Sequence, residues 1–480
     1  MAEGGVFGFS PLVFRRNGWQ LAEHAREATP YGMQRLLSTA VWDADLVRDD
    51  LRDYVYEHLG QASGILVIDE TSFPKSGDKS AGVKEQYCGT TGQVENCQVA
   101  VFLDYVTDLG HTLIDCALYL PKEWIDDRQR CREAGIPDTV GFQTKCELAR
   151  QMVQRIYYAQ VPISWVVADT VYGNNLDLRT WLQHHGYWFV LAVECRESVG
   201  IRTADGRRRL LHVREVVAEL IHAQDWQRLS MGDGTKGPRL YDWVCVPILD
   251  AWEDDGHHWL LIRRCIDPPK TMTYYLVFGP HGTTLQQMVT VLGFRWRIED
   301  DFQTSKGMGL DQYEVRRWVC WYRHITLVLL AHALLTVICA KDRNTIIVEA
   351  SAAESASSAT GAEASAAESA SSATDVDASV SPLPISQGSA LMAAEPPSVS
   401  VLAGPPPVGL ALCCVQVACK PLPPVLRPAP LTIPEVRHLL GCLIWPASTN
   451  ATFMLAWSRW RRYHRSMASY YHTKKRLDAG

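Results

Sequence analysis

The N-terminal part of the chain carries apolar residues at helical spacing. Over residues 19–60 these apolar positions are Met33, Leu36, Leu37, Ala40, Val41, Leu46, Leu51, Val55 and Leu59. Apolar residues that recur every three or four positions predict amphipathic helices. Pro30 precedes this pattern and Gly60 follows it, as expected at a helix start and a helix end.

From residue 64 the pattern becomes that of strands. GILVIDE is a short apolar run rich in β-branched residues, typical of a buried strand. ENCQVAVFLDYV and HTLIDCALYL follow and predict a hairpin with Asp108, Leu109 and Gly110 in its turn. Residues 143–160 predict a helix, WVVADTVYG a strand, LDLRTWLQHHG a helix closed by Gly186, and WFVLAV a further strand. This order predicts an α/β core.

Residues 195–282 have a different texture, with charged and glycine-containing turns between strand-like pieces. The pieces are YDWVCVPIL, HHWLLIRRC and MTYYLVFG, which predict a β-rich insertion. Residues 284–342 are strongly helical in pattern. Their longest apolar run, residues 325–340, has 16 residues and contains His332. It is short for a bilayer span, so we expect a buried helix and no membrane association.

The segment after the core is compositionally biased. EASAAESASSAT stands at residues 349–360 and again at 363–374, and a proline-rich stretch occupies residues 382–430. Such segments bury little apolar surface, so we expect disorder or a transient helix. The predicted division is a helical region at 1–62, a core at 63–194 and 283–342, the insertion at 195–282, a linker at 343–430 and a basic helical tail at 431–480.

Charge and cysteine content bear on the kind of partner, on zinc binding and on the redox compartment. The formal net charge is −6, whereas nucleic-acid-binding proteins often carry a basic excess. The basic residues concentrate in the tail, where residues 457–480 hold seven Lys or Arg and one acid. The chain has 14 Cys but no CxxC pair, so cysteine-type zinc spacing is absent. We expect buried thiols in a reducing cytosol, as for Cys97, Cys116, Cys245 and Cys339.

Two aspartates end apolar strands. Asp69 ends GILVIDE, and Asp169 follows WVVA. Each alone is most simply a strand-end cap or turn former. Together, on strands that are expected to be neighbours, they would repel each other, and a divalent cation relieves such repulsion.

A third carboxylate lies in the C-terminal helical region. In FRWRIEDDFQTSKG, Arg295, Glu299, Phe302 and Lys306 fall at offsets 0, 4, 7 and 11, which is one face of a helix. The simplest interpretation is a solvated face with an i,i+4 ion pair between Arg295 and Glu299. Asp300 and Asp301 are rival carboxylates, but each successive residue is rotated by roughly 100° from that face.

The arrangement R-(3)-E-(6)-K, formed by Arg295, Glu299 and Lys306, resembles the Y-(2)-R-(3)-E-(6)-K signature of bacterial insertion-sequence transposases of the DDE superfamily. The resemblance is to the insertion-sequence-four group, and most closely to its seven-hundred-one branch. It covers roughly residues 17–342 and 431–476, and it rests also on NGWQLAE, RLLSTAVWDADLVRDDLRDYV, VIDET, KSAGVKEQYCGTTGQVENCQV, LYLPKEW, VVADTVYG and GLDQYEVRRW. Leu292 stands at the position of the signature's Tyr.

The resemblance implies a ribonuclease-H-like catalytic core with three metal-binding carboxylates. Asp69 would bridge two Mg²⁺ ions, with Mn²⁺ as a possible substitute, and Asp169 and Glu299 would each complete one. The implied reaction is strand cleavage and strand transfer at the ends of the element that encodes the protein, which is cut-and-paste DNA transposition. The implied partners are terminal inverted repeats, target DNA and a second copy of the chain, in the bacterial cytoplasm at the nucleoid.

Further residues could contact DNA. The resemblance implies phosphate contacts by Arg295 and Lys306. Tyr172 could approach DNA or simply pack. The tail residues Arg459, Arg461 and Arg462 predict a backbone-binding helix, with a solvated basic terminus as the alternative. One insertion tryptophan could stack on a base, although packing in the core is the simpler role for each of Trp226, Trp243, Trp252 and Trp259.

Two alternatives to an active transposase stay open. Leu292 and the duplicated linker are compatible with a decayed copy that folds and binds DNA without catalysis. A ribonuclease-H-like nuclease recruited to another task is the other alternative.

Overall fold

The computed structural model describes residues 18, 21–22, 30–203, 205–234, 237–249, 255–267, 271–370, 429–444 and six positions between 462 and 470. The chain divides into two compact units, one formed by Met1–Arg343 with Pro430–Ser458 and the other by Asn344–Ala429 with Arg459–Gly480. Every described strand belongs to the first unit.

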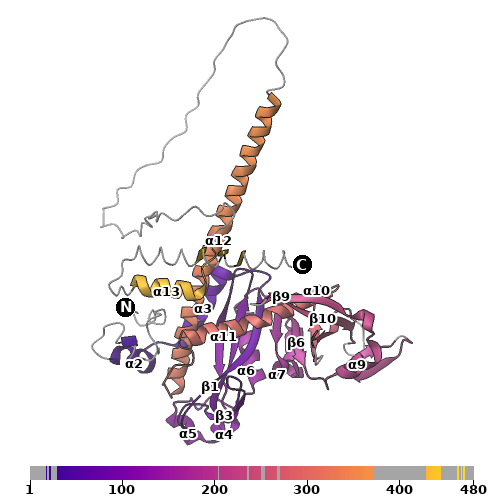
Figure 1. The fold of residues 1–480 in the computed structure, drawn as a ribbon. Helices are drawn as coiled ribbons and strands as arrows, with labels where there is room; N and C mark the ends of the chain where they lie inside the picture. Colours follow the sequence, from indigo (N-terminus) through magenta and orange to yellow (C-terminus); the bar gives the residue numbers. More distant parts are fainter. Residues whose placement is uncertain are drawn as a thin grey trace, which may run out of the picture. The chain divides into compact units, whose positions relative to one another are not determined.

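A ten-stranded mixed sheet forms the centre of the first unit (Figure 1). Its order is β2-β3-β1-β5-β6-β12-β11-β10-β9, with β4 paired to β3. The strands are β1 Ile65–Pro74, β2 Lys84–Cys88, β3 Gln93–Val106, β4 His111–Leu118, β5 Trp165–Ala168, β6 Trp188–Val193, β9 Gln227–Gly234, β10 Gly237–Pro247, β11 His258–Arg264 and β12 Met272–Phe278. Two further strands, β7 Ser198–Arg202 and β8 Arg208–His212, form a separate hairpin. The predicted α/β class is confirmed.

The helices are α2 Tyr31–Ser38, α3 Ala44–Leu59, α4 Lys122–Asp126, α5 Arg128–Glu133, α6 Lys145–Tyr158, α7 Thr170–Gly173, α8 Leu176–His184, α9 Val213–Leu220, α10 Leu285–Gly293, α11 Arg297–Gly307, α12 Trp318–Ala370 and α13 Ile433–Ile444, with 3-10 turns at Ala223–Asp225 and Phe294–Trp296. Several helices begin at residues suited to capping. Asp43 accepts a hydrogen bond from the backbone of Asp45 at α3, and Thr144 with Glu147 forms a capping box at α6.

The first strands follow the predicted order. β3 and β4 form the predicted antiparallel hairpin, in which Val106 pairs with His111. β1 runs parallel to β5, and β5 runs parallel to β6. Helices α7 and α8 make the crossover from β5 to β6, and helix α6 precedes β5 after the β3–β4 hairpin. Strand β2 and helices α4 and α5 were not predicted, because residues 84–88 and 122–133 are short and largely polar.

The insertion extends the same sheet. β12 pairs antiparallel with β6, so β9–β12 continue the core sheet at its far side. Trp243 is fully buried there, which makes packing its role. The Trp226 ring lies 4.0 Å from the Arg264 guanidinium carbon, while Trp252 lies outside the described residues.

The predicted buried helix is part of α12. Within the described residues, Trp318–Ile346 is the one helix long and apolar enough to span a membrane, and 72% of its most apolar window is buried. Its Tyr322 hydroxyl accepts a hydrogen bond from the backbone of Leu118, so the helix packs against β4 as a core element. The backbone of α12 stays helical to Ala370, through the first alanine-rich repeat.

Helix α3 packs differently from the predicted apolar face. Leu51, Val55 and Leu59 are buried as expected, but Leu46 is 64% exposed. Arg48 and Arg52 are buried instead, because they reach Asp115 on β4. A purely apolar pattern therefore misplaces the first turns of this helix.

Asp115 on β4 is a completely buried carboxylate that binds arginines from two helices, α3 and α6. Its oxygens lie 3.2 Å from Arg48 Nε, 3.4 Å from Arg52 Nη1 and 2.7 Å from Arg155 Nη2. Burial alone would raise the pKa of Asp115, but the guanidinium groups of Arg155, Arg48 and Arg52 more than offset it and lower the pKa. The network thus ties α3 and α6 to β4.

We expect Asp115→Asn to destabilise the protein by about 3–5 kcal/mol, because breaking a buried ion pair leaves uncompensated charge in the interior. Chemical denaturation monitored by circular dichroism measures this loss. Asp49→Asn is the matched control, since Asp49 pairs with Arg52 from a side chain that is 54% exposed. The control should cost less than about 1 kcal/mol. Equal losses in both variants would contradict the assigned role of Asp115.

Candidate active site

Strands β1 and β5 bring the first two carboxylates to neighbouring positions. Ile68 and Ala168 are register partners on these parallel strands, so Asp69 and Asp169 follow them side by side. Asp69 Oδ1 accepts a hydrogen bond of 2.8 Å from the backbone of Glu70. Asp169 caps the short helix α7, because its Oδ1 accepts a hydrogen bond of 2.9 Å from the backbone of Val171. The predicted adjacency of the two strands is confirmed, and so is the simpler capping role of Asp169.

Helix α11 brings Glu299 to the same place. Arg295, in the 3-10 turn that leads into α11, lies with Nη2 2.9 Å from Glu299 Oε1 and Nη1 3.4 Å from Asp69 Oδ2. One guanidinium therefore joins two of the three predicted carboxylates. The predicted i,i+4 ion pair between Arg295 and Glu299 is confirmed.

The rest of α11 shows why Glu299 is the carboxylate at this place. Phe302 is buried, and its ring lies 5.4 Å from the Phe102 ring on β3. Asp301 is completely buried and faces the core, while Asp300 is half-buried. The rotation of roughly 100° per residue along the helix therefore directs Glu299, Asp300 and Asp301 to different sides of α11, as predicted.

The site is short of positive charge. Burial raises the pKa of Asp69 to about 7; Arg295 opposes this rise and the charge of Asp169 adds to it. Burial and the charge of Glu70 likewise raise the pKa of Asp169. Among the residues that the structure describes, Asp169 has no ion pair, so Arg295 is the only cation that pairs directly with these three carboxylates. The arrangement favours a bound cation.

Lys306 lies further along α11. Its Nζ donates a hydrogen bond of 3.2 Å to Thr90 Oγ1, and Thr90 in turn donates to the backbone oxygen of Ser72 on β1. Burial lowers the pKa of Lys306. The lysine therefore approaches the loop after β2, beyond Asp69 along β1.

Tyr172 does not reach the surface. Its side chain is fully buried, and its hydroxyl donates a hydrogen bond of 2.7 Å to Glu70 Oε2. Glu70 also accepts a hydrogen bond of 2.6 Å from Lys145 Nζ. Successive strand residues point to opposite faces, so Glu70 faces α6 while Asp69 faces α11. The burial and the hydrogen bond of Tyr172 agree with the packing role, and a DNA contact of Tyr172 stays a prediction.

Trp296 is a candidate that sequence patterns did not single out. It follows Arg295 directly, is 47% exposed, and its ring lies 5.5 Å from the Arg239 guanidinium carbon. The sequence FRWRIED contains the relevant signal, because Trp296 stands between two arginines and three residues before Glu299.

The predicted tail contacts are largely outside the described residues. Arg459 and Arg461 fall there, and Arg462 is described as a half-buried helical residue. The backbone-binding helix therefore stays a prediction.

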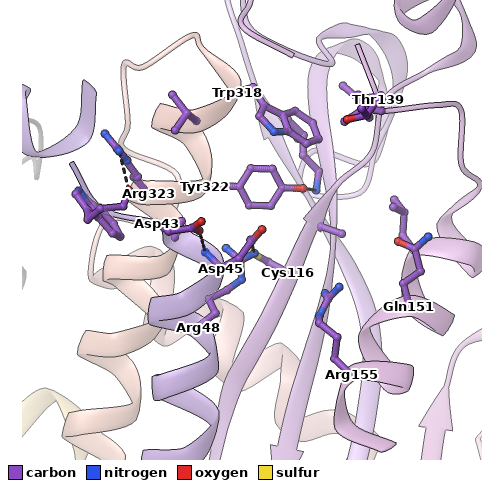
Figure 2. A pocket seen from close by; sticks show the side chains of 18 of the residues that line it. Asp43, Asp45, Arg48, Cys116, Thr139, Gln151, Arg155, Trp318, Tyr322 and Arg323 are labelled. Atoms are coloured by element: carbon purple, nitrogen blue, oxygen red, sulfur yellow. Dashed lines mark hydrogen bonds and ion pairs between the residues drawn. The ribbon is translucent and has the colours of Figure 1, made fainter. Parts of the chain in front are cut away.

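A cavity of about 1030 Å³ lies elsewhere, lined by residues of α3, β4, α6 and α12 (Figure 2). None of the three carboxylates lines it. Its charged groups pair with protein groups. Arg48 binds Asp45, and Arg323 Nη2 donates a hydrogen bond of 2.7 Å to the backbone oxygen of Trp42. The charged groups named in this cavity form structural contacts. The cluster of Asp69, Asp169 and Glu299 is therefore the better candidate for an active site.

Two comparisons with known proteins concern sequence. Residues 15–238 match a family model described as DDE superfamily endonuclease. This stretch includes Asp69 and Asp169 and ends before Glu299. A probable transposase for insertion sequence element IS701 from Microchaete diplosiphon is 28% identical over 145 residues. The match covers 30% of this chain and 35% of the relative, so it spans about a third of the relative's length.

A comparison with solved structures gives a match to the NurA nuclease from Sulfolobus solfataricus. It has a TM-score of 0.21 and 10% identity, and it covers 64% of this chain and 91% of the nuclease. A score this low carries no argument about fold. Over residues 15–238, just under half of its length, the chain is therefore similar to DDE superfamily endonucleases, and over 145 residues it is similar to a probable transposase of the IS701 type.

Proposed function

We propose that the chain is a transposase that cleaves and joins DNA strands at the ends of its own insertion sequence. The observation that carries this proposal is that Asp69 and Asp169 follow register partners on neighbouring strands while Arg295 pairs with both Asp69 and Glu299, in a chain that is similar to DDE superfamily endonucleases. A site used only for stability would gain nothing from three neighbouring acids of which only two are paired, and those with the same arginine.

We propose a ribonuclease-H-like architecture for the core. The strand order β4-β3-β1-β5-β6 supports it, with an antiparallel part (β4, β3, β1) and a parallel part (β1, β5, β6). The central strand β1 carries Asp69, and its parallel neighbour β5 leads to Asp169. The insertion strands precede α11, so the chain extends its sheet before it returns with Glu299.

The donor set fits Mg²⁺. All three side chains offer oxygen ligands, which hard divalent cations prefer, and the charge shortage around Asp69 and Asp169 is the kind that such a cation removes. Asp69 would be shared between two ions, while Asp169 and Glu299 would each hold one. Bound Mg²⁺ would supply Lewis-acid stabilisation of charge on the phosphate oxygens.

Arg295 would bind and orient the DNA backbone. It is 26% exposed, and a guanidinium can form paired hydrogen bonds with two phosphate oxygens. Arg295 would be free to turn from Asp69 and Glu299 to a phosphate if these carboxylates held a cation. Lys306 would add a point charge, and the exposed Trp296 ring would offer a surface for stacking beside the site.

The wider setting follows from the same proposal. The substrates would be the terminal inverted repeats and the target DNA, and two copies of the chain would act on the two ends. The ten free cysteines of the described residues suit the reducing bacterial cytoplasm. Leu292 is buried in α10, so its departure from the family signature changes a packed position.

Asp69→Asn, Asp169→Asn and Glu299→Gln should each abolish Mg²⁺-dependent cleavage of a DNA duplex that carries the element's end. The loss should reach about 10²–10³-fold or more, because metal-assisted charge stabilisation contributes several kcal/mol and each 1.36 kcal/mol is tenfold in rate. DNA binding, measured by gel shift, should remain.

Asp300→Asn is the matched control for these variants, because it removes the same charge one residue from Glu299. It should retain cleavage. Full activity in Glu299→Gln would overturn the assignment of the third carboxylate. A wild-type chain that binds the ends but never cleaves them would instead indicate the decayed copy. Cleavage of DNA without repeats, and without strand joining, would indicate the recruited nuclease.

Lys306→Ala tests the phosphate contact separately from the chemistry. We expect uniformly weaker DNA binding on all sequences, and a slope of log affinity against log salt that is smaller by about 1, because one fewer counterion is released. Fluorescence anisotropy at several salt concentrations measures the slope. An unchanged slope would mean that Lys306 serves only to hold Thr90.

A further inference from the structure

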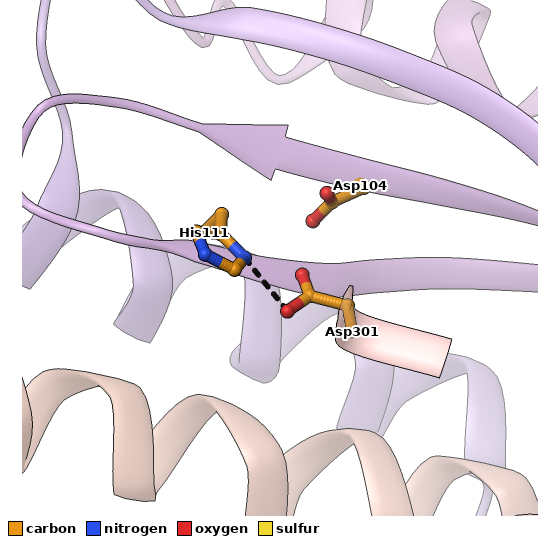
Figure 3. A group of neighbouring side chains, drawn as sticks. All are labelled: Asp104, His111 and Asp301. Atoms are coloured by element: carbon orange, nitrogen blue, oxygen red, sulfur yellow. Dashed lines mark hydrogen bonds and ion pairs between the residues drawn. The ribbon is translucent and has the colours of Figure 1, made fainter. Parts of the chain in front are cut away.

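A second cluster of ionisable side chains lies under α11, on the side away from Glu299. It consists of Asp104 on β3, His111 on β4 and Asp301 on α11 (Figure 3). One ligand atom of each residue lies within 4.8 Å of the others. His111 Nδ1 lies 2.7 Å from Asp301 Oδ1. These residues are far apart in the sequence, and none belongs to the proposed catalytic set.

The two carboxylates of this cluster are buried without matching donors. Asp104 and Asp301 are both fully buried. Within the described part of the chain, neither oxygen of Asp104 nor Oδ2 of Asp301 has a partner at good hydrogen-bond geometry, although the Asp301 carboxyl and the backbone of Tyr105 lie close to Asp104. Native proteins seldom leave buried polar groups unpartnered, because such groups lose their hydrogen bonds to water without replacement. Burial raises the pKa of both carboxyl groups well above the ordinary value.

A second histidine borders the cluster from α12. His332 is fully buried, and its Nδ1 lies 3.3 Å from Thr112 Oγ1 and 3.4 Å from Ser305 Oγ. Its Nε2 lies 3.4 Å from Asp301 Oδ1 and has no hydrogen-bond partner among the described residues. If Nδ1–H donates to a hydroxyl, the Nε2 lone pair faces the carboxylates. Metal-binding histidines are commonly oriented in this way by their other ring nitrogen.

We propose that Asp104, His111 and Asp301 bind one divalent transition-metal ion of the zinc type, and that His332, which lies outside this group of three, turns its Nε2 toward the ion as the fourth ligand. Two carboxylates neutralise the charge of such an ion, and two neutral imidazoles complete a set of four ligands made of His nitrogen and Asp oxygen, both of which zinc accepts. Imidazole ligands favour zinc-like ions, whereas Mg²⁺ prefers oxygen ligands and keeps several waters. Burial lowers the pKa of His111 and brings that of His332 to about 3, which leaves both rings in the neutral, ligating form.

The site has a route to solvent and a structural consequence. The His111 side chain is 24% exposed, so the cluster reaches the surface at this residue. A bound ion would join β3, β4, α11 and α12. Asp301 is two residues from Glu299 on α11, so the ion would also fix the helix that carries the third carboxylate. This last consequence, unlike the metal site itself, rests on the proposed function.

The test measures metal content and Co²⁺ absorption in the full-length protein. The protein is stripped with a chelator, reloaded with Zn²⁺ or Co²⁺, dialysed, and analysed by mass spectrometry for metal. We expect one ion per chain in the wild type and visible d–d bands of four-coordinate Co²⁺. Asp104→Asn and His111→Gln should lose the ion or bind it at least about 10²-fold more weakly. The second variant alters the partly exposed ligand and serves if the first does not fold.

Two controls separate this site from the proposed catalytic one. Asp300→Asn, which changes the neighbouring acid on α11, should retain the ion. Asp69→Asn should also retain it, even though it is expected to lose DNA cleavage. No retained ion in the wild type would overturn the proposal and would indicate two carboxyls that share a proton. Retention in Asp104→Asn and His111→Gln together with loss in Asp69→Asn would overturn it as well.

Discussion

The excess of carboxylates beneath helix α11 is the constraint on which this structure depends. On one side of the helix, Asp69 and Glu299 share a single arginine, and Asp169 lies beside Asp69 without an ion pair among the described residues. On the other side, Asp104 and Asp301 are buried together with two neutral histidines. Acids in such positions either take up protons or bind cations. Burial raises the pKa of Asp69 and of Asp104, so the charged form of each carboxyl is disfavoured without a cation. The two proposed metal sites would each supply that cation.

Packing keeps these two groups of acids apart. Phe302 of α11 contacts Phe102 of β3 between them, and Asp69 is the register partner of Phe102 on β1. Glu299 and Asp301 are two positions apart on the helix, so they point to nearly opposite sides. The same aromatic contact thus places one acid at the surface beside Arg295 and the other in the core. The distant Asp115 network contributes by holding α3 and α6 to β4 beneath this arrangement.

Local patterns predicted the parts of the fold that depend on short-range preferences. The β3–β4 hairpin, the buried strands β1, β5 and β6, and the α10–α12 region follow from apolar runs and turn residues. The adjacency of Asp69 and Asp169 followed from strand-end positions, whereas Glu299 needed the family signature in addition to its helical face.

Arg48 and Arg52 show where the pattern fails, because buried arginines look like surface residues until their partner Asp115 is known. The role of Tyr172 on α7 could not be predicted for the same reason, since its hydrogen-bond partner Glu70 lies on the distant strand β1. The Asp104–His111–Asp301 cluster escaped notice because its ligands have no short spacing such as CxxC and are assembled only by the sheet and α11.

The central claim is that three carboxylates from β1, from the end of β5 and from α11 form one cation site. Anomalous diffraction from crystals of the protein grown with Mn²⁺ tests this most directly. We predict anomalous density bounded by Asp69, Asp169 and Glu299, with the side chain of Arg295 displaced from at least one of its carboxylate partners. Ordered side chains at these positions with no anomalous density among them, under saturating Mn²⁺ and with end DNA bound, would contradict the account.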